Sequence, residues 1–302
     1  MRKFKSDILD EYENYLSIIQ EKSNQTIKGY MMDIELFIEY LKGTDKFENM
    51  EFNEEFIQSI ELSHIYGFLN YLKKERGNCA NTRARKIASI KSFFKYCENK
   101  LEIIKSNPTG KLETPKIPKK QINYLSLDEC RNLLNCIGGR NKERDYAIIT
   151  IFLNTGLRLS ELRNIELSKI KGDTLIVRGK GNKDRTIYLN DTVLSAIEKY
   201  KECRKGQSNF LFTSERGSVI SKREIQYIVQ KNIEAAGLDI SKYTTHKLRH
   251  TAATLLFKSN VDIRTLQVIL GHKSINTTQI YTHVDSDDVR KAVKCNPLNI
   301  NT

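Results

Sequence analysis

Six polar residues in the second half of the chain have the types and spacing needed to break a phosphodiester bond. They are Arg158, Lys180, His246, Arg249, His272 and Tyr281. Phosphodiesters are very inert, so an enzyme must supply a large part of the barrier. Two guanidiniums can each donate paired hydrogen bonds to the equatorial oxygens of a pentavalent phosphorus, which ammonium groups cannot do. The set predicts cleavage of a nucleic-acid backbone by a protein hydroxyl, and it contains no obvious metal cage.

Two of these residues, Arg158 and His246, also have ordinary structural interpretations, and that of His246 is a packing residue within its helix. Arg158 can be an arginine at a helix start that pairs with Glu161. Arg249 lies three residues after His246, so both project from one helical face. That pairing favours His246 as a group that accepts or relays the proton of the nucleophile. His250 lies off this line, and we interpret it as structural.

The other three candidates lie near turns or helix ends. His272 follows a Leu-Gly pair that ends a helix, so it can donate to a non-bridging oxygen or simply cap the helix. Lys180 lies at a hairpin tip between two glycines, which suits protonation of a departing 5′ hydroxyl, although Lys183 is a competitor. Tyr281 has an ordinary pKa of about 10, so it needs the arginines and a base to attack. Its distance from His272 singles it out among 14 tyrosines.

The composition bounds the class of protein and its partner. The 302 residues, with 39% apolar and 29% charged, suffice for two domains of ordinary size. Lys and Arg exceed Asp and Glu by 50 to 37, and this net charge of +13 favours a polyanionic partner. The chain shows no secretion signal and no apolar run near the ~20 residues that span a bilayer. Six scattered cysteines without a Cys-x-x-Cys pair indicate a reduced cytoplasm.

Residues 105–122 form a basic, proline-containing linker in our prediction. Three of the four prolines lie here, and proline favours an extended backbone. The segment carries five lysines and one glutamate between 105 and 120, so it either follows a phosphate backbone or is a solvated tether. We expect residues 1–104 to form a helical DNA-binding domain and residues 123–302 a mixed catalytic domain.

The pattern before the linker is helical throughout. Apolar residues recur at steps of three and four from Ile27 to Leu41, and a bundle of about four helices is the natural interpretation. A helix at 82–96 has a basic face, which we favour as a DNA-facing surface over a merely solvated one. Its proposed contact residues are Arg83, Arg85, Lys86 and Lys91.

The pattern after the linker is mixed, so the fold class is mainly α with a small antiparallel β-sheet. A helix ends at Gly156, and the strands at 175–177 and 186–189 form a hairpin. A glycine at 271 is expected to end another helix. The candidate helix caps are Ser221 (in a capping box with Glu224), Thr245, Asp262 and Ser274.

The sequence motifs around the six candidate residues together resemble those of the tyrosine site-specific recombinase, or phage integrase, family. Arg158 in Thr-Gly-Leu-Arg-Leu-Ser-Glu-Leu looks like its first arginine, and Lys180 in Gly-Lys-Gly-Asn-Lys-Asp-Arg like its hairpin lysine. His246-x-x-Arg249 and Leu-Gly-His272 resemble its next two boxes, and Tyr281 its nucleophile. The front of the chain resembles the family's core-binding, SAM-like domain, as in the simple Xer-type subgroup.

The resemblance implies a defined reaction and defined partners. Tyr281 would form a 3′-phosphotyrosine, and strands would exchange through a Holliday junction without a metal or nucleotide cofactor. The implied partners are double-stranded DNA with a specific recombination site and a homo- or hetero-tetramer joined by C-terminal tails. An accessory protein is possible, a membrane is not implied, and the setting would be the nucleoid in a bacterial cytoplasm.

Two rival functions stay open at this point. A type IB topoisomerase shares the chemistry but relaxes supercoils as a monomer; the short basic chain with a Xer-like front argues against it. A DNA-binding protein that does not cut would be the other, although every catalytic residue type is present. Chromosome-dimer resolution and integration, excision or inversion by a mobile element are not distinguished by the sequence.

Overall fold

The computed structural model divides into two compact units, Met1–Lys119 and Lys120–Thr302. It describes residue 4 and residues 6–115, 123–179, 184–271 and 277–278. Lys180, His272 and Tyr281 therefore lie outside the described residues, as does the cap predicted at Ser274. Within the described part, no helix combines the length and apolarity needed to cross a bilayer.

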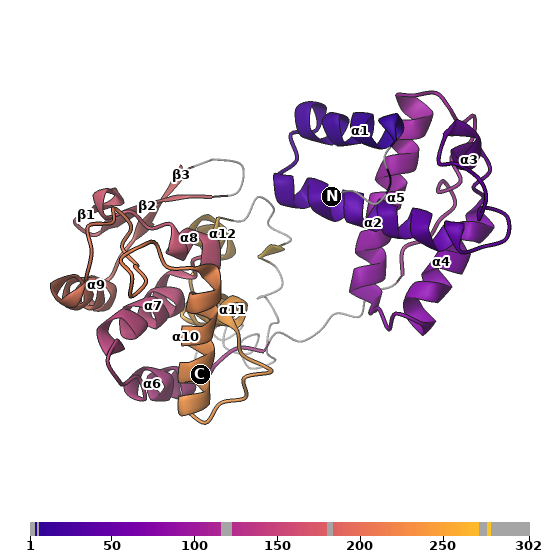
Figure 1. Cartoon of the computed structure of the whole chain (residues 1–302). Helices are drawn as coiled ribbons and strands as arrows, with labels where there is room; N and C mark the ends of the chain where they lie inside the picture. Colours follow the sequence, from indigo (N-terminus) through magenta and orange to yellow (C-terminus); the bar gives the residue numbers. More distant parts are fainter. Residues whose placement is uncertain (1–3, 5, 116–122, 180–183, 272–276, 279–302) are drawn as a thin grey trace, which may run out of the picture. The chain divides into compact units, whose positions relative to one another are not determined.

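The first unit is helical, as the apolar periodicity predicted (Figure 1). Its elements are α1 (Asp7–Asn14), the π-helical η1 (Tyr15–Ile19), α2 (Asn24–Lys42), α3 (Glu54–Gln58), α4 (Leu62–Lys74) and α5 (Ala80–Asn99). The Ser23 hydroxyl accepts from the Thr26 amide and so caps α2, the type of cap that helix starts favour. Phe37, Phe68 and Phe94, from α2, α4 and α5, are buried together and hold the bundle.

A buried ionic cluster joins α2 to α5. Asp33 is 1% exposed and accepts two hydrogen bonds from the Arg85 guanidinium, at 2.5 and 2.7 Å. Lys86 Nζ and Ser89 Oγ each donate to it at 2.8 Å. Because a buried carboxylate requires partners for all its lone pairs, the cluster fixes α5 against α2.

The cluster changes the interpretation of the basic face of α5. Lys86 is 8% exposed, and its ammonium is used inside the domain. Arg83 donates to the Asn78 carbonyl, and Lys91 Nζ donates to the Leu112 carbonyl at 2.6 Å. Arg85 retains a half-exposed side chain. Part of the positive charge counted from sequence as a DNA-facing surface therefore stabilises the bundle.

The beginning of the predicted linker packs on the first unit. Turns close through hydrogen bonds from Gly110 N to Asn107 O and from Leu112 N to Thr109 O. Leu112 is 3% exposed and belongs to the same core as the helices. An extended chain was expected here because of the prolines. Instead, the buried Leu112 side chain and the hydrogen bond from Lys91 to the Leu112 carbonyl hold this stretch against the helices.

The second unit contains eleven elements among its described residues. They are α6 (Leu127–Asn135), α7 (Lys142–Thr155), α8 (Leu159–Arg163), the 3₁₀ turn η2 (Leu167–Lys169), β1 (Ile170–Lys171), β2 (Thr174–Arg178), β3 (Asp184–Tyr188), α9 (Asp191–Cys203), α10 (Lys222–Ala235), α11 (Thr245–Lys258) and α12 (Ile263–Leu270). α7 lies centrally, packed against α9, α10 and α11 (Figure 1). Its residues Ala147–Leu153 are all buried, as expected for a helix covered on every side.

The predicted hairpin is present, within a three-stranded antiparallel sheet of order β1-β2-β3. Leu175 pairs with Ile187 and Val177 with Arg185. Side chains alternate in burial along β3, with Ile187 buried and Tyr188 exposed. The side chains at 185 and 187 therefore point to the same, inward face of the strand.

Glycines in the left-handed conformation end two of the helices, as their positions predicted. Gly156, at φ +61°, ends α7, and Gly271, also at φ +61°, ends α12. Asp262 caps α12 through the amides of Arg264 and Thr265, also as predicted. The cap expected at Thr245 is displaced by one residue, because Thr244 is the N-cap residue and Thr245 is the first helical residue.

The buried cluster in the first unit yields a stability prediction. Asp33→Ala should lower the free energy of unfolding by about 3–5 kcal/mol, since it leaves the Lys86 ammonium buried without its counterion. Urea denaturation of the full chain, followed by circular dichroism, measures this loss. The control Asp45→Ala removes an exposed carboxylate and should change stability by less than about 0.5 kcal/mol. Equal effects of the two substitutions would contradict the role of Asp33.

Candidate active site

Arg158 is placed by the short turn between α7 and α8. Gly156 reverses the chain after α7, and Arg158 then takes the extended N-cap conformation of α8. Its backbone amide donates to Glu161 Oε2 at 2.8 Å, and its Nη1 donates to Glu161 Oε1 at 2.8 Å. Its Nη2 donates to the carbonyl of Gly271 at 3.1 Å. The pairing with Glu161 and a role at a phosphate are thus compatible, because the side chain keeps 31% exposure.

Arg249 reaches the same place from α11. Its Nη1 donates to the carbonyl of Gly156 at 2.5 Å, and its Nη2 donates to the carbonyl of Leu270 at 2.7 Å. Its Nη1 also lies 3.9 Å from Glu161 Oε2. The structure therefore brings together, beside one carboxylate, the two arginines that the sequence singled out.

Glu161 is the centre of this arrangement. Its side chain is 3% exposed, and three guanidiniums surround it, from Arg158, Arg185 and Arg249. Burial raises the pKa of Glu161, but the hydrogen bonds and charges of Arg185 and Arg158 outweigh it and lower that pKa to about 2. The carboxylate is therefore ionised at neutral pH. One negative charge among three positive charges leaves a cationic site suited to a phosphate group.

Arg185 is the residue that sequence reasoning missed. It donates from Nη1 to Glu161 Oε1 at 2.8 Å and from Nη2 to Glu161 Oε2 at 2.9 Å. The signal available in the sequence was its position two residues before Ile187, on the apolar face of the strand. A cation on that face requires a buried acid, and Glu161 provides it.

The two predicted histidines of α11 differ in their surroundings. His246 is exposed, one turn before Arg249 on the same helix. His250 is half-buried, and burial, followed by the charges of Lys247, Arg249 and His246, lowers its pKa to about 4. His250 is therefore neutral at physiological pH, as suits a structural imidazole, whereas His246 is accessible to solvent and to a substrate.

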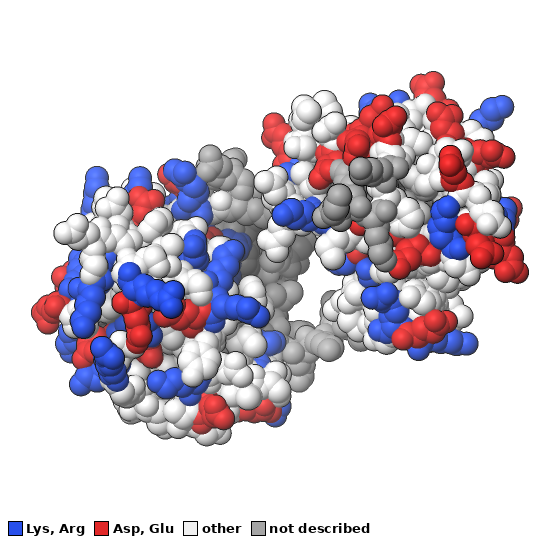
Figure 2. All heavy atoms as spheres, in the orientation of Figure 1, with Lys and Arg blue, Asp and Glu red and all other residues white. Residues whose placement is uncertain are grey.

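The excess positive charge belongs almost entirely to the second unit. Residues 1–119 contain 20 Lys and Arg against 18 Asp and Glu, whereas residues 120–302 contain 30 against 19. On the face shown in Figure 2, the first unit carries many acidic side chains, and blue side chains are numerous on the second. The unit that holds the paired arginines is thus also the one with the electrostatic character of a nucleic-acid-binding surface.

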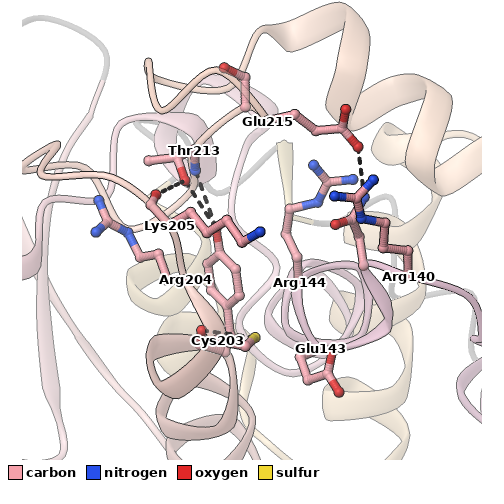
Figure 3. A pocket seen from close by; sticks show the side chains of 11 residues that line it. Arg140, Glu143, Arg144, Cys203, Arg204, Lys205, Thr213 and Glu215 are labelled. Atoms are coloured by element: carbon pink, nitrogen blue, oxygen red, sulfur yellow. Dashed lines mark hydrogen bonds between the residues drawn. The ribbon is translucent and has the colours of Figure 1, made fainter.

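A separate hollow at the C-terminal end of α9 also contains several cations (Figure 3). Arg204 donates there to the carbonyls of Leu211 and Phe210, at 3.0 and 2.8 Å. Arg144 pairs with Asp145 and Glu224. These arginines hold the loop after α9 and the start of α10 in place, so the hollow has an architectural explanation.

The chain has a helical unit followed by a mainly helical unit with a small antiparallel sheet and paired arginines, and comparisons with known proteins assign this arrangement to a class of DNA-processing enzymes. The sequence profile of the Phage integrase family matches residues 123–287, and that of its N-terminal SAM-like domain matches residues 9–100. A tyrosine recombinase XerC of Caldanaerobacter subterraneus is 47% identical, over 97% of this chain and 87% of the relative. A tyrosine recombinase XerD of Staphylococcus saprophyticus is 32% identical, over 94% and 96% of the two chains.

Solved structures agree on the fold. The Tn1549 transposon integrase bound to transposon right-end DNA has a TM-score of 0.76 at 22% identity, covering 95% of this chain and 98% of that one. The XerH recombinase bound to a palindromic difH substrate has a TM-score of 0.74 at 22% identity, covering 95% and 83%.

The chain belongs to the phage integrase family of tyrosine recombinases. The resemblance drawn from the sequence boxes is thereby confirmed, as are the mainly helical fold with a small sheet and the class of enzyme. Its activity is site-specific DNA recombination.

The ion pairs between Glu161 and its surrounding arginines predict a pH dependence of stability. A carboxylate whose pKa is lowered from 4.5 to about 2 stabilises the fold above its ordinary pKa, and the contribution is lost as the pH falls through this window. The stability difference between the wild-type chain and Glu161→Gln should therefore shrink by on the order of 3 kcal/mol between about pH 5 and pH 2. Urea titrations at several pH values measure this stability difference. A difference that is independent of pH would contradict a stabilising role of the ionised Glu161 carboxylate.

Proposed function

We propose that Tyr281 attacks a DNA phosphodiester at a specific recombination site and forms a 3′-phosphotyrosine intermediate. The observation that carries this proposal is the convergence of Arg158 and Arg249 on Glu161, within a unit that carries most of the chain's positive charge. Two guanidiniums fixed before substrate arrives can stabilise the charge that develops on the phosphorus oxygens without reorganising. The tyrosine hydroxyl then needs only proximity and removal of its proton.

The other predicted residues complete the reaction in this proposal. His246, exposed on α11 beside Arg249, accepts or relays the proton of Tyr281. Lys180, from the turn between β2 and β3, protonates the departing 5′ hydroxyl. His272, directly after the end of α12, donates to a non-bridging oxygen. The covalent phosphotyrosine preserves the energy of the broken bond, so the freed hydroxyl of a second strand can reverse the attack.

The proposed assembly is a tetramer on two double-stranded DNA sites, with exchange through a Holliday junction. Subunits of one or two kinds would be linked through their C-terminal tails, with or without an accessory protein. The named relatives are bacterial recombinases, and we place the activity at the nucleoid, in the cytoplasm. Resolution of chromosome dimers and movement of a mobile element are both compatible with this chemistry.

Trapping of the covalent intermediate tests the nucleophile. The substrate is a nicked duplex carrying the site recovered by sequencing DNA that is covalently attached to the protein in cells. Tyr281→Phe should form no adduct and still bind DNA, because only the attacking oxygen is lost. Tyr66→Phe removes an exposed hydroxyl from the first unit and should leave the adduct unchanged. An adduct with Tyr281→Phe would identify another nucleophile, and supercoil relaxation without strand exchange would identify a topoisomerase.

The arginines predict a separation of cleavage from binding. Arg158→Ala and Arg249→Ala should each lower the cleavage rate by about 10²–10³-fold, as removal of a preorganised charge donor does. Both variants should retain DNA affinity, since the second unit carries many other Lys and Arg residues. Single-turnover cleavage and a gel-shift titration measure the two quantities. Loss of binding at unchanged cleavage of the bound fraction would count against a catalytic role.

The salt dependence of DNA affinity tests the contribution of α5. We propose that Arg83 and Arg85 contact phosphates through their exposed parts, while Lys86 and Lys91 mainly support the domain. Each phosphate contact contributes about −0.9 to the slope of log affinity against log salt concentration. Arg83→Gln should make the slope shallower by about this amount, whereas the buried Lys86→Gln should leave it unchanged. Equal slopes for the wild type and Arg83→Gln would remove Arg83 from the interface.

A further inference from the structure

Arg185 holds the buried carboxylate of the active site from the side of the sheet. Its two terminal nitrogens bind the two oxygens of Glu161, at 2.8 and 2.9 Å, in a parallel fork. The same two oxygens accept the bonds from Arg158, one from its guanidinium and one from its backbone amide. The orientation of Arg158 is therefore defined by a carboxylate that Arg185 orients.

Arg249 lies beside the same carboxylate. Its Nη1 lies 3.9 Å from Glu161 Oε2, while its short hydrogen bonds go to the carbonyls of Gly156 and Leu270. A carboxylate that is 3% exposed requires close partners, because water cannot solvate it. Without Arg185, the remaining guanidiniums are the nearest charges that can satisfy Glu161, and each would be drawn away from the place where a phosphate binds.

The end of α12 confines the Arg185 guanidinium. A Cβ added to Gly271 would lie 2.9 Å from its Cζ, Nε and Nη1, so the group lies against the bare glycine backbone. The Nε is buried and has no hydrogen-bond partner among the described residues. The guanidinium is thus located by the fork to Glu161 and by close packing.

We propose that Arg185 is a positioning residue of the cleavage reaction, which occupies Glu161 so that Arg158 and Arg249 remain directed at the scissile phosphate. Arg185 does not itself contact the reacting atoms. This role rests on the proposed function. This role differs from the one proposed for Lys180, because Arg185 acts through the carboxylate of Glu161 and not on a reacting group.

Single-turnover cleavage by the full chain on the nicked duplex tests the proposal. Arg185→Gln should lower the cleavage rate about 10- to 100-fold, the range that a small misplacement of catalytic groups produces, with DNA affinity unchanged. Arg185→Lys retains a charge that can reach one carboxylate oxygen and should recover part of that loss. The matched control is Arg178→Gln on the adjacent strand, where the arginine pairs with Asp184 in an exposed ion pair and not with Glu161. It should cleave at the wild-type rate.

A double-mutant cycle identifies the route of the effect. If Arg185 acts through Glu161, adding Arg185→Gln to the Glu161→Gln variant should lower the cleavage rate by less than about threefold. The reason is that the side chain at 161, which Arg185 orients, is already neutral in that variant. Losses that multiply in the double variant would overturn the proposal. So would cleavage by Arg185→Gln at the wild-type rate.

Thermal melts of each variant separate misfolding from misplacement. If Glu161→Gln does not fold, the cleavage rates of Arg185→Lys and Arg185→Gln are compared instead. The proposal is overturned if Arg185→Lys cleaves no faster than Arg185→Gln. A wild-type chain that forms no covalent adduct defeats the proposed function, and this proposal with it. A wild-type adduct with an unaffected Arg185→Gln defeats this proposal alone.

Discussion

The candidate active site is organised around one buried carboxylate that arginines neutralise. Glu161 is removed from water, and an isolated ion there would be strongly unfavourable. Its partners come from three different parts of the chain: the cap of α8, strand β3 and helix α11. Satisfying this single charge therefore assembles elements that are far apart in the sequence, and it leaves an excess of positive charge at the site.

Backbone geometry supports this charge arrangement at two glycines. At Gly156 and Gly271, a left-handed conformation ends a helix and brings a carbonyl to within hydrogen-bonding distance of an arginine. Both positions also lack space for a side chain, since a Cβ would lie 2.8 Å from Leu270 at the first and 2.9 Å from Arg185 at the second. Local conformation, packing and electrostatics thus impose the same residue at these positions.

The sequence predicted those features whose cause is local. Apolar periodicity identified the helices, alternation identified the β2-β3 hairpin, and Gly271 and Asp262 marked the ends of α12. The spacing of Arg158 and Arg249 within family-like boxes pointed to the site, although their meeting at Glu161 depends on tertiary contacts. The family comparison supports the assignment of the chain as a whole, and the catalytic roles of all six residues stay proposals. Of these residues, Lys180, His272 and Tyr281 also lie outside the described part.

The features that were missed depend on partners distant in the chain. Lys86 was counted as a surface cation because its helix has a basic face, but Asp33, 53 residues earlier, draws it inward. Arg185 received no role, since its partner Glu161 lies 24 residues away across the fold. The short helix α3 and the strand β1 are also held by tertiary contacts, and their brief segments carry too little periodicity to be recognised.

The carbonyls of Leu270 and Gly271 add a mechanical consequence. In the DNA-free chain, the last turn of α12 is tethered to both arginines through these two oxygens. Each arginine therefore holds a backbone carbonyl in place in addition to lying beside Glu161. A substitution at either arginine should thus loosen the end of α12 as well as remove a charge from the site.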